Sequence, residues 1–333
     1  MNIRDVLKKI ANGQSLTEEE SFECFSSLFD GNIELPQAGA FLFGLKIKKE
    51  APSELTGAVK AALKRANLVE INNGKTIDTC GTGGDGKNSF NCSTAVALFL
   101  ADMGYKVVKH GNRAISSKCG SADILEKLNI PFPKTKADVE SMLNKYNFAF
   151  LFAPFFHPSF KNVAPIRKSL GVPTIFNLMG PLLNPARPKY QLVGVADENM
   201  INTIAHVLKG LGVEKAAVVH GAEGFDEISP CGTSKILFID KEKIESSFID
   251  PRDFDMELAD PKDLVCNSEE ESLKVMKEIL TGKAPSAIKN MVSLNLGVCL
   301  FLLEKDVSLK ECIEEAKKRV GQGVKTLKGL VTC

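Results

Sequence analysis

The sequence of 333 residues contains no tryptophan, only four histidines and no two cysteines in a C-x-x-C arrangement. It also lacks an H-E-x-x-H motif. These absences exclude the familiar zinc-site patterns, and nine scattered cysteines do not suggest a disulfide framework. The cysteines are therefore predicted to be reduced thiols, which indicates a cytoplasmic protein.

Excess charge and long apolar runs are missing as well. The 42 Lys and Arg residues nearly balance 41 Asp and Glu residues, so no general field would draw the chain to nucleic acid or to an anionic membrane. The most apolar stretch, residues 291–303, is too short to span a bilayer and predicts a buried helix. The first ten residues, MNIRDVLKKI, lack the apolar core of a signal peptide. We expect no nucleic-acid partner and no membrane partner.

The hydrophobic pattern predicts an α/β protein with a helical N-terminal part. The first 70 residues show helical periodicity and no strand-like run. Beyond them, short apolar runs alternate with helices, which predicts a larger α/β domain with a mostly parallel central sheet flanked by helices. Strands are expected at 75–79, 105–109, 148–152, 190–195, 216–219 and 236–239. Long helices are expected at 285–304 and 309–327.

A proline-rich stretch interrupts this alternation. Residues 162–188 contain five prolines and the run N-L-M-G-P-L-L-N-P, which predicts a crossing between two domains.

A glycine-rich loop follows the first predicted strand. Residues 78–86 read D-T-C-G-T-G-G-D-G, and the next helix opens with Asn91, Ser93 and Thr94. Glycines let backbone N–H groups approach a ligand closely, and a helix N-terminus attracts anions, so the segment indicates a phosphate site. A tight strand-to-helix turn with ordinary capping is the alternative.

Two common nucleotide motifs do not explain this loop. Gly81-x-Gly83-x-x-Gly86 matches the dinucleotide fingerprint, but Lys109 and His110 stand where an acidic residue should hold the ribose. A nicotinamide cofactor is therefore not expected. The sequence also contains no G-x-x-x-x-G-K-[ST] motif.

A second loop follows the second predicted strand. Residues 109–121 read K-H-G-N-R-A-I-S-S-K-C-G-S, with three cations and several hydroxyls. If the two strands are parallel neighbours, both loops lie at the same edge of the sheet and can bind one polyanion. The alternative is a solvated basic loop.

Three further positions suggest substrate and metal chemistry. The adjacent carboxylates Asp226 and Glu227 suit Mg²⁺, which prefers oxygen ligands and bridges to phosphates. On their own they would be ordinary surface residues. Arg167 could pair with a carboxylate of a second substrate. No Ser/His/Asp or Cys/His nucleophile set can be assembled from the spacing.

Taken together, these segments resemble the anthranilate phosphoribosyltransferases of tryptophan biosynthesis. The resemblance rests on G-T-G-G-D-G, N-C-S-T, K-H-G-N-R-A-I-S-S-K-C-G-S-A-D, H-P-S-F-K-N-V-A-P-I-R, F-N-L-M-G-P-L-L-N-P and the Asp-Glu pair, and covers nearly the whole chain. It implies transfer of the 5-phosphoribosyl group from phosphoribosyl pyrophosphate to the amine of anthranilate, the second step from chorismate to tryptophan.

The resemblance also implies a domain division and a homodimer. A helical domain of residues 1–70 plus roughly 165–185 would carry the dimer contact and the anthranilate side. An α/β domain of residues 71–164 and 186–333 would bind phosphoribosyl pyrophosphate and Mg²⁺.

The site residues implied by the resemblance form three sets. Phosphoribosyl pyrophosphate would be bound by Gly81, Gly84, Asp85, Ser89, Asn91, Cys92, Ser93, Thr94, Lys109, His110, Gly111, Asn112, Arg113, Ala114, Ile115, Ser116, Ser117 and Ser121. Anthranilate would meet Gly81, His110, Asn112, His157, Arg167, Gly180 and Pro181. Two Mg²⁺ ions would be served by Ser93, Asp226 and Glu227. Lys109 and Arg113 are predicted to act electrostatically, and no general base is assigned.

Two other functions remain open at this point. A pyrimidine nucleoside phosphorylase resembles this family in fold and phosphate loops, but would not need the Asp-Glu pair. A non-catalytic nucleic-acid-binding relative would want a basic surface stripe, which the balanced charge does not favour.

Overall fold

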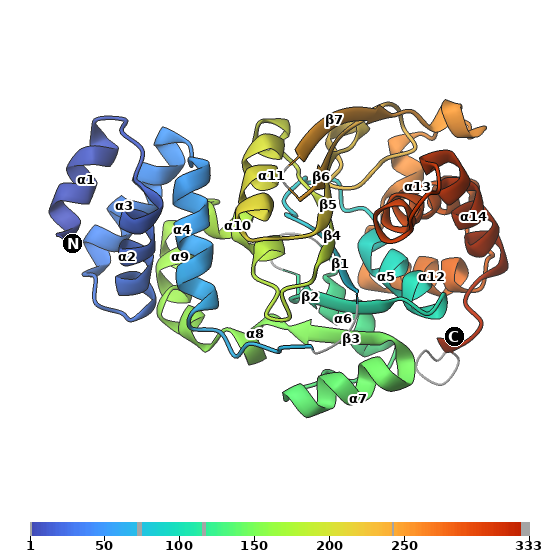
Figure 1. Cartoon of the computed structure of the whole chain (residues 1–333), viewed down its shortest axis with the longest axis horizontal. Helices are drawn as coiled ribbons and strands as arrows, with labels where there is room; N and C mark the ends of the chain where they lie inside the picture. Colours follow the sequence, from blue (N-terminus) through green and yellow to red (C-terminus); the bar gives the residue numbers. More distant parts are fainter. Residues whose placement is uncertain (1, 72–74, 115–117, 242, 328–333) are drawn as a thin grey trace.

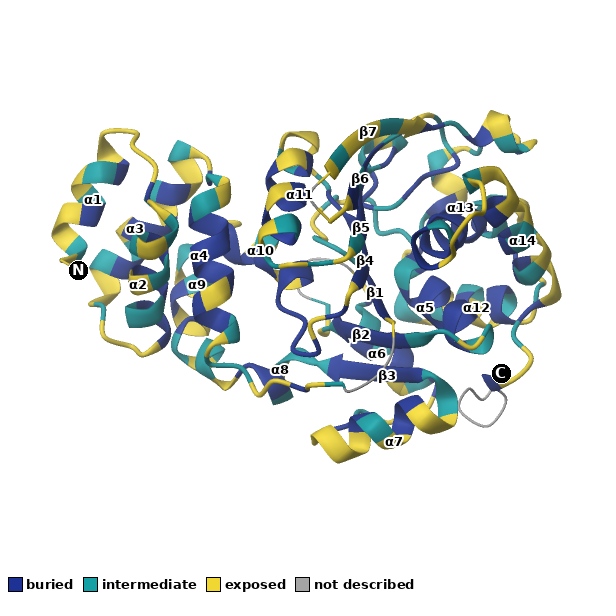
Figure 2. Cartoon of the chain, in the orientation of Figure 1, coloured by how far each residue is buried: buried dark blue, intermediate teal, exposed yellow. Residues whose placement is uncertain are grey.

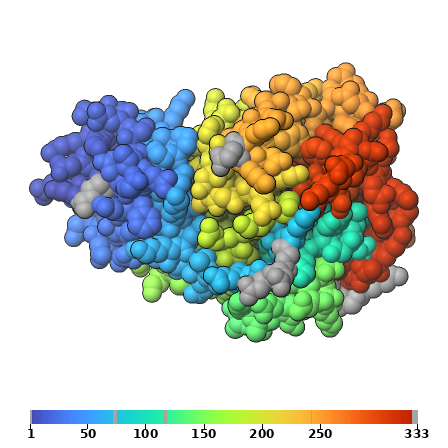
Figure 3. Space-filling view, in the orientation of Figure 1, coloured from blue at the N-terminus to red at the C-terminus, as the bar shows by residue number. Residues whose placement is uncertain are grey.

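The computed structural model describes residues 2–71, 75–114, 118–241 and 243–327, and shows a helical bundle beside an α/β body (Figure 1). The bundle contains the N-terminal helices α1 (Ile3–Ala11), α2 (Glu18–Phe29), α3 (Leu35–Lys48) and α4 (Pro52–Leu63). In the space-filling view these residues form one end of the molecule, and the residues beyond about 250 form the other (Figure 3).

Part of the proline-rich stretch returns to this bundle. Helices α9 (Ala164–Leu170) and α10 (Ile175–Met179) pack against α3, and α10 also packs against α4. The helical domain of residues 1–70 plus roughly 165–185 stays a prediction.

Within the described part of the chain, seven strands form one sheet in the order β3-β2-β1-β4-β5-β6-β7. The strands are β1 (Thr76–Gly81), β2 (Lys106–Gly111), β3 (Phe148–Phe152), β4 (Tyr190–Gly194), β5 (Lys215–His220), β6 (Ser234–Asp240) and β7 (Lys243–Ile249). The first five in this order are parallel, and β6 and β7 are antiparallel additions. The predicted mostly parallel sheet is confirmed.

Helices cover both faces of the sheet, because its buried strands alternate their side chains between two cores. Leu192 of β4 belongs to a core with α5 (Cys92–Asp102) and α13 (Ser286–Leu303), whereas Val193 belongs to a core with α11 (Ile201–Gly210) and the bundle. The second core therefore runs without a break from the bundle into the sheet. Figure 2 shows the central strands as largely buried.

The remaining helices are short or peripheral. They are α6 (Ser121–Lys127), α7 (Lys136–Tyr146), α8 (Ala153–Phe156), α12 (Glu269–Leu280) and α14 (Leu309–Gln322). By length and composition α13 could cross a membrane, but 72% of it is buried inside the protein, where it packs against α14 and α5. This confirms the buried helix predicted around residues 291–303.

Four expectations from the sequence need correction. Strand β7 and helix α12 were not predicted, and the last helix ends at Gln322 rather than near residue 327. Gly323 follows with φ +71°, a left-handed conformation that closes the helix. Strand β2 also extends beyond Lys109 to Gly111, so His110 lies within the strand.

Candidate active site

The two predicted loops leave the sheet side by side. Strand β1 pairs in parallel with β2 and with β4, so the loops after Gly81 and Gly111 start at the same carboxyl edge. Asn91, at the start of α5, donates a hydrogen bond from Nδ2 to the carbonyl oxygen of Cys119, 3.1 Å away. This bond ties the first loop to the second and confirms that the loops are neighbours.

Beneath both loops lies Lys109, whose side chain is almost fully buried. Its ammonium donates hydrogen bonds to the Thr79 carbonyl oxygen and to Ser93 Oγ, the latter at 3.1 Å. Burial lowers the pKa of Lys109, and the Asp78 carboxylate opposes this shift. Burial raises the pKa of Asp78 to about 6, although Oδ2 accepts a 2.8 Å hydrogen bond from Asn184. The result is a buried polar network that joins β1, β2 and α5.

The acidic pair comes from a distant part of the chain to the same edge. Asp226 Oδ2 accepts a 2.8 Å hydrogen bond from the Gly83 backbone N–H. A Cβ atom on Gly81 would lie 2.1 Å from Asp226 Oδ2, and one on Gly194 would lie 1.4 Å from its carbonyl oxygen. Glycine at these strand ends is therefore what lets the acidic segment cross the edge of the sheet.

Asp85 joins Asp226 and Glu227 in a cluster of three carboxylates. One oxygen of each lies within 4.8 Å of the others. Among the described residues, Asp85 Oδ2 and Glu227 Oε2 are buried and have no hydrogen-bond partner. Burial, together with the neighbouring carboxylates, raises the pKa of both Asp226 and Glu227. Crowded, unpartnered carboxylate oxygens fit Mg²⁺, which takes oxygen ligands and cancels their repulsion.

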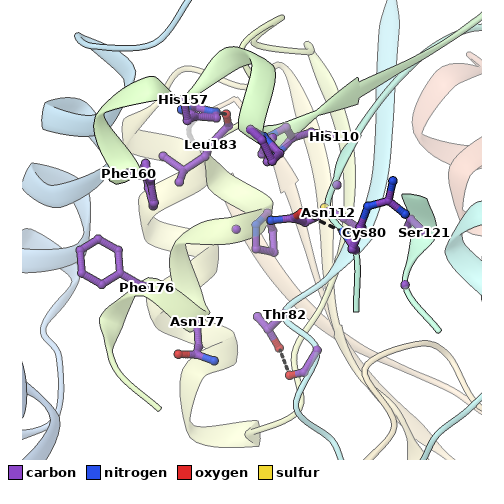
Figure 4. Close-up of a pocket in the computed structure, with 18 of the residues that line it drawn as sticks. Cys80, Thr82, His110, Asn112, Ser121, His157, Phe160, Phe176, Asn177 and Leu183 are labelled. Atoms are coloured by element: carbon purple, nitrogen blue, oxygen red, sulfur yellow. Dashed lines mark hydrogen bonds between the residues drawn. The ribbon is translucent and has the colours of Figure 1, made fainter. Parts of the chain in front are cut away.

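A cavity of about 610 Å³ opens beside the two loops and extends to α8, α9 and α10. Figure 4 shows His110, His157 and Leu183 together at one end, Phe160 and Phe176 along one side, and Asn177 and Thr82 at the opposite end. The predicted site residues that line it are Gly81, Gly84, Ser93, Lys109, His110, Gly111, Asn112, Arg113, Ala114, Ser121, His157, Arg167, Gly180 and Pro181.

Other predicted residues lie behind this surface. Cys92 and Thr94 are fully buried at the start of α5, and Ser89 forms a β-bridge with Val265. Asp226 and Glu227 border a small void that shares Cys80 and Ser93 with the large cavity. Ile115, Ser116 and Ser117 lie outside the described residues.

The chain matches two parts of one glycosyl transferase family. Residues 4–66 match its helical bundle domain, and residues 73–325 match its a/b domain. The anthranilate phosphoribosyltransferase of Nitratidesulfovibrio vulgaris is 46% identical over 323 residues, which cover 96% of each chain.

Solved structures agree with this similarity. The anthranilate phosphoribosyltransferase of Thermus thermophilus superimposes with a TM-score of 0.86 at 34% identity, covering 96% of this chain and 95% of that one. The Saccharomyces cerevisiae enzyme in complex with PRPP and Mg gives a TM-score of 0.88 at 26% identity, covering 99% and 96%. The chain belongs to the anthranilate phosphoribosyltransferase family.

Membership of the anthranilate phosphoribosyltransferase family makes the chain an enzyme, and decides against the two alternative functions, a pyrimidine nucleoside phosphorylase and a non-catalytic nucleic-acid-binding protein. A glycosyl transferase of this family joins a phosphorylated sugar to an aromatic amine, so the cavity must offer both an anion site and a flat, partly apolar site.

An aromatic side of the cavity, formed by Phe160 and Phe176, meets the second requirement and was not predicted from the sequence. The Phe176 ring lies 5.3 Å below the Arg167 guanidinium, and the Phe160 ring contacts Phe176 edge to face. Burial lowers the pKa of Arg167, and among the described residues no carboxylate pairs with it. Phe160 and Phe176 do lie in two of the family motifs, H-P-S-F-K-N-V-A-P-I-R and F-N-L-M-G-P-L-L-N-P. Nothing in their spacing shows that their side chains face a cavity.

Two buried histidines close one end of the cavity. The rings of His110 and His157 lie 5.2 Å apart in an edge contact. His157 Nε2 donates a 2.8 Å hydrogen bond to the Leu183 carbonyl oxygen, which leaves Nδ1 as an acceptor. Burial lowers the pKa of His157 to about 4. Burial also lowers the pKa of His110 to about 3, and the neighbouring His157 adds to this second shift. Both rings are therefore neutral and only weakly basic at pH 7.

Arg113 lines the cavity but is engaged elsewhere. Its guanidinium forms ion pairs with Asp123 at 3.1 Å and with Glu126 at 2.8 Å, and lies over the Phe152 ring. Its predicted electrostatic role stays a prediction, because that role requires these ion pairs to open.

We predict that His157→Gln reduces the pH dependence of folding stability in acid. Because the folded-state pKa of His157 lies near 4 and the unfolded-state pKa near 6.5, the unfolded chain binds more protons between these values. Its contribution to the free energy of unfolding is therefore complete above pH 6.5 and falls by up to about 1.4 kcal/mol per pH unit below it. Urea unfolding of the wild type and the variant from pH 7 to pH 4 measures the slope.

The exposed His206 provides the matched control. His206→Gln should leave the slope unchanged. A His157→Gln slope equal to that of the wild type would show that burial does not keep this ring neutral.

Proposed function

We propose that the large cavity binds phosphoribosyl pyrophosphate against the two loops and anthranilate against the bundle side, and that the phosphoribosyl group passes between them. The observation that carries the proposal is the convergence at one sheet edge of a glycine-rich loop, a buried lysine and three carboxylates. The match to the yeast enzyme in complex with PRPP and Mg supports it.

The reaction needs stabilisation of a departing anion more than proton transfer. Pyrophosphate leaves C1 of the ribose with concentrated negative charge, while the ribose gains positive character. Preorganised donors that face developing charge are the strongest single contribution available to an enzyme. Lys109, whose position the Thr79 carbonyl and Ser93 hydroxyl fix, and the backbone N–H groups of the first loop supply such donors here.

Asp85, Asp226 and Glu227 would hold Mg²⁺, with Ser93 on the side toward the large cavity. Bound there, the metal would neutralise phosphate charge in the ground state and in the transition state. We propose two ions, because three carboxylates and a pyrophosphate group carry more negative charge than one divalent ion cancels.

Arg167 would bind the carboxylate of anthranilate. Its guanidinium has an aromatic ring on one side, and among the described residues no acidic partner competes for it. We propose that the ring of anthranilate is surrounded by residues that line this cavity, namely His110, Asn112, His157, Gly180 and Pro181. The aromatic amine is neutral at pH 7, so positioning it near C1 is the main requirement.

A homodimer is proposed through helix α3. Leu35, Phe43 and Ile47 repeat at multiples of four along this helix and are 68%, 47% and 69% exposed. With Gly39 between them they form one apolar stripe, of the kind that protein interfaces cover. We also place the enzyme in the cytoplasm, consistent with its free cysteines.

Anthranilate fluorescence should disappear only when phosphoribosyl pyrophosphate and Mg²⁺ are both present. The double variant Asp226→Asn, Glu227→Gln should lower kcat by about 100-fold or more and raise the Mg²⁺ concentration needed for half activity. An unchanged Mg²⁺ dependence would contradict the metal role. Phosphorolysis of thymidine or uridine without loss of anthranilate would contradict the function itself.

Arg167→Ala should raise the KM for anthranilate roughly 10- to 100-fold, since a hydrogen bond to a charged group contributes about 1.5–3 kcal/mol. The KM for phosphoribosyl pyrophosphate should change much less. The neighbouring exposed cation gives the control, because Lys168→Ala should alter neither value. Equal increases of both KM values in Arg167→Ala would show a structural role instead.

The double variant Phe43→Glu, Ile47→Glu should be monomeric by sedimentation while the wild type sediments as a dimer. Two charges in an apolar contact are costly to desolvate, so association should be lost. Glu34→Gln, which precedes the stripe, should leave the dimer intact. A dimer that survives in the double variant would place the contact elsewhere.

A further inference from the structure

A second cavity, of about 270 Å³, lies at the amino edge of the sheet and shares Pro181 with the predicted anthranilate site. It is bordered by Leu63 at the end of α4, by Leu208 at the end of α11, and by the segment that crosses from the bundle to β4. Helices α4 and α11 pack against each other. The cavity therefore sits where the helical bundle meets the α/β body.

The lining combines an apolar wall with positive charge. Leu182, Leu211 and Val213 add to the apolar side, whereas Arg187 and Lys189 are exposed at the opening. Among the described residues, neither cation forms an ion pair, and none of the residues that line the cavity is acidic.

Glu214, which directly precedes β5, forms no ion pair with either cation among the described residues. Its N–H donates to the Lys189 carbonyl oxygen, and its carboxylate accepts a hydrogen bond from Tyr190 Oη at 3.3 Å. Arg187 also adopts φ +48°, an uncommon conformation for a residue other than glycine. Its N–H donates to the Asn184 carbonyl oxygen at 3.0 Å, which holds this turn beside the cavity.

A thin wall separates this cavity from the large one. Gln191 borders the small cavity and is almost fully buried, and its Nε2 donates a 2.5 Å hydrogen bond to the Pro181 carbonyl oxygen. The same nitrogen lies 3.7 Å from Cys80 Sγ. Pro181 borders both cavities, and Cys80 lines the large one. A ligand in the small cavity would therefore press on residues that shape the large one.

We propose that the small cavity is a binding site for a monocarboxylate with an aromatic ring or a branched alkyl group, and that its occupation changes ligand affinity in the large cavity through Pro181. The apolar wall takes the ring, and Arg187 and Lys189 pair with the carboxylate. By thermodynamic linkage the coupling acts in both directions. The proposal does not depend on which reaction the large cavity performs.

The probe is 3-(4-fluorophenyl)propanoate, and its binding to the full chain is followed by ¹⁹F NMR. We expect a Kd of about 1 mM or tighter. Arg187→Ala with Lys189→Ala should weaken binding about tenfold or more, and the neutral amide of the same probe should bind as weakly to the wild type. The anthranilate-consuming activity without probe should be unchanged in this double variant, which shows that it is folded.

A probe with a carboxylate could also enter the large cavity, so Arg167→Ala provides the second arm. Binding that persists in Arg167→Ala and is lost in the Arg187/Lys189 variant supports the proposal. Binding that shows the reverse pattern, or no binding at all, overturns it. The probe should also shift the KM for anthranilate about threefold or more in the wild type, and should leave it unchanged in the Arg187/Lys189 double variant. Binding of the probe without a shift in KM overturns the proposed coupling between the two cavities.

Discussion

The site is organised around one buried ammonium group. Lys109 extends from β2 beneath the first loop and donates to the Thr79 carbonyl of β1 and the Ser93 hydroxyl of α5. Burying an amino group costs several kcal/mol unless charge and hydrogen bonds compensate, and the Asp78 carboxylate, held by Asn184, compensates part of this cost. Three elements far apart in sequence must therefore keep their relative positions for the network to be stable. That rigidity holds the first loop where its N–H groups can meet an anion.

The carboxylate cluster also destabilises the fold, through electrostatic repulsion. Asp85, Asp226 and Glu227 repel one another in a buried setting, and glycine at positions 81 and 194 removes the side chains that would keep the acidic segment away. Folding alone would not favour such an arrangement. The divalent cation proposed above would offset this repulsion when bound, so that metal binding would stabilise the folded site.

Much of this architecture could be predicted from the sequence. Strongly apolar strands such as Phe148–Phe152, and the two loops with their glycines and cations, carry clear local signals. Strand β7 could not be predicted in the same way, because it lies at an exposed edge and its sequence, KIESSFI, is mostly polar. Helix α12 did have a signal, because Ser268 caps the N–H of Glu271 and the buried residues Met276, Ile279 and Leu280 repeat with helical spacing. This helix could therefore have been predicted from the sequence.

The site was harder to predict than the fold, for a physical reason. The contact between Asp226 and Gly83 joins residues 143 positions apart, and only the sheet order brings them together. Local patterns likewise could not show that Arg113 is held by Asp123 and Glu126, or that Phe176 lies beneath Arg167. Residue types indicated the chemistry, whereas the partners of each residue depend on tertiary packing.

The unbroken core between the bundle and the sheet has a consequence for how such proteins can diversify. The Phe25 and Phe41 rings of the bundle are in tilted contact, Phe25 contacts Phe176 edge to face, and the Phe176 ring lies beneath Arg167. A chimera that exchanged the N-terminal helices between two relatives would thus alter the packing under an arginine more than a hundred residues away in the chain. The helical bundle and the α/β body therefore have to be exchanged together in any engineered chimera.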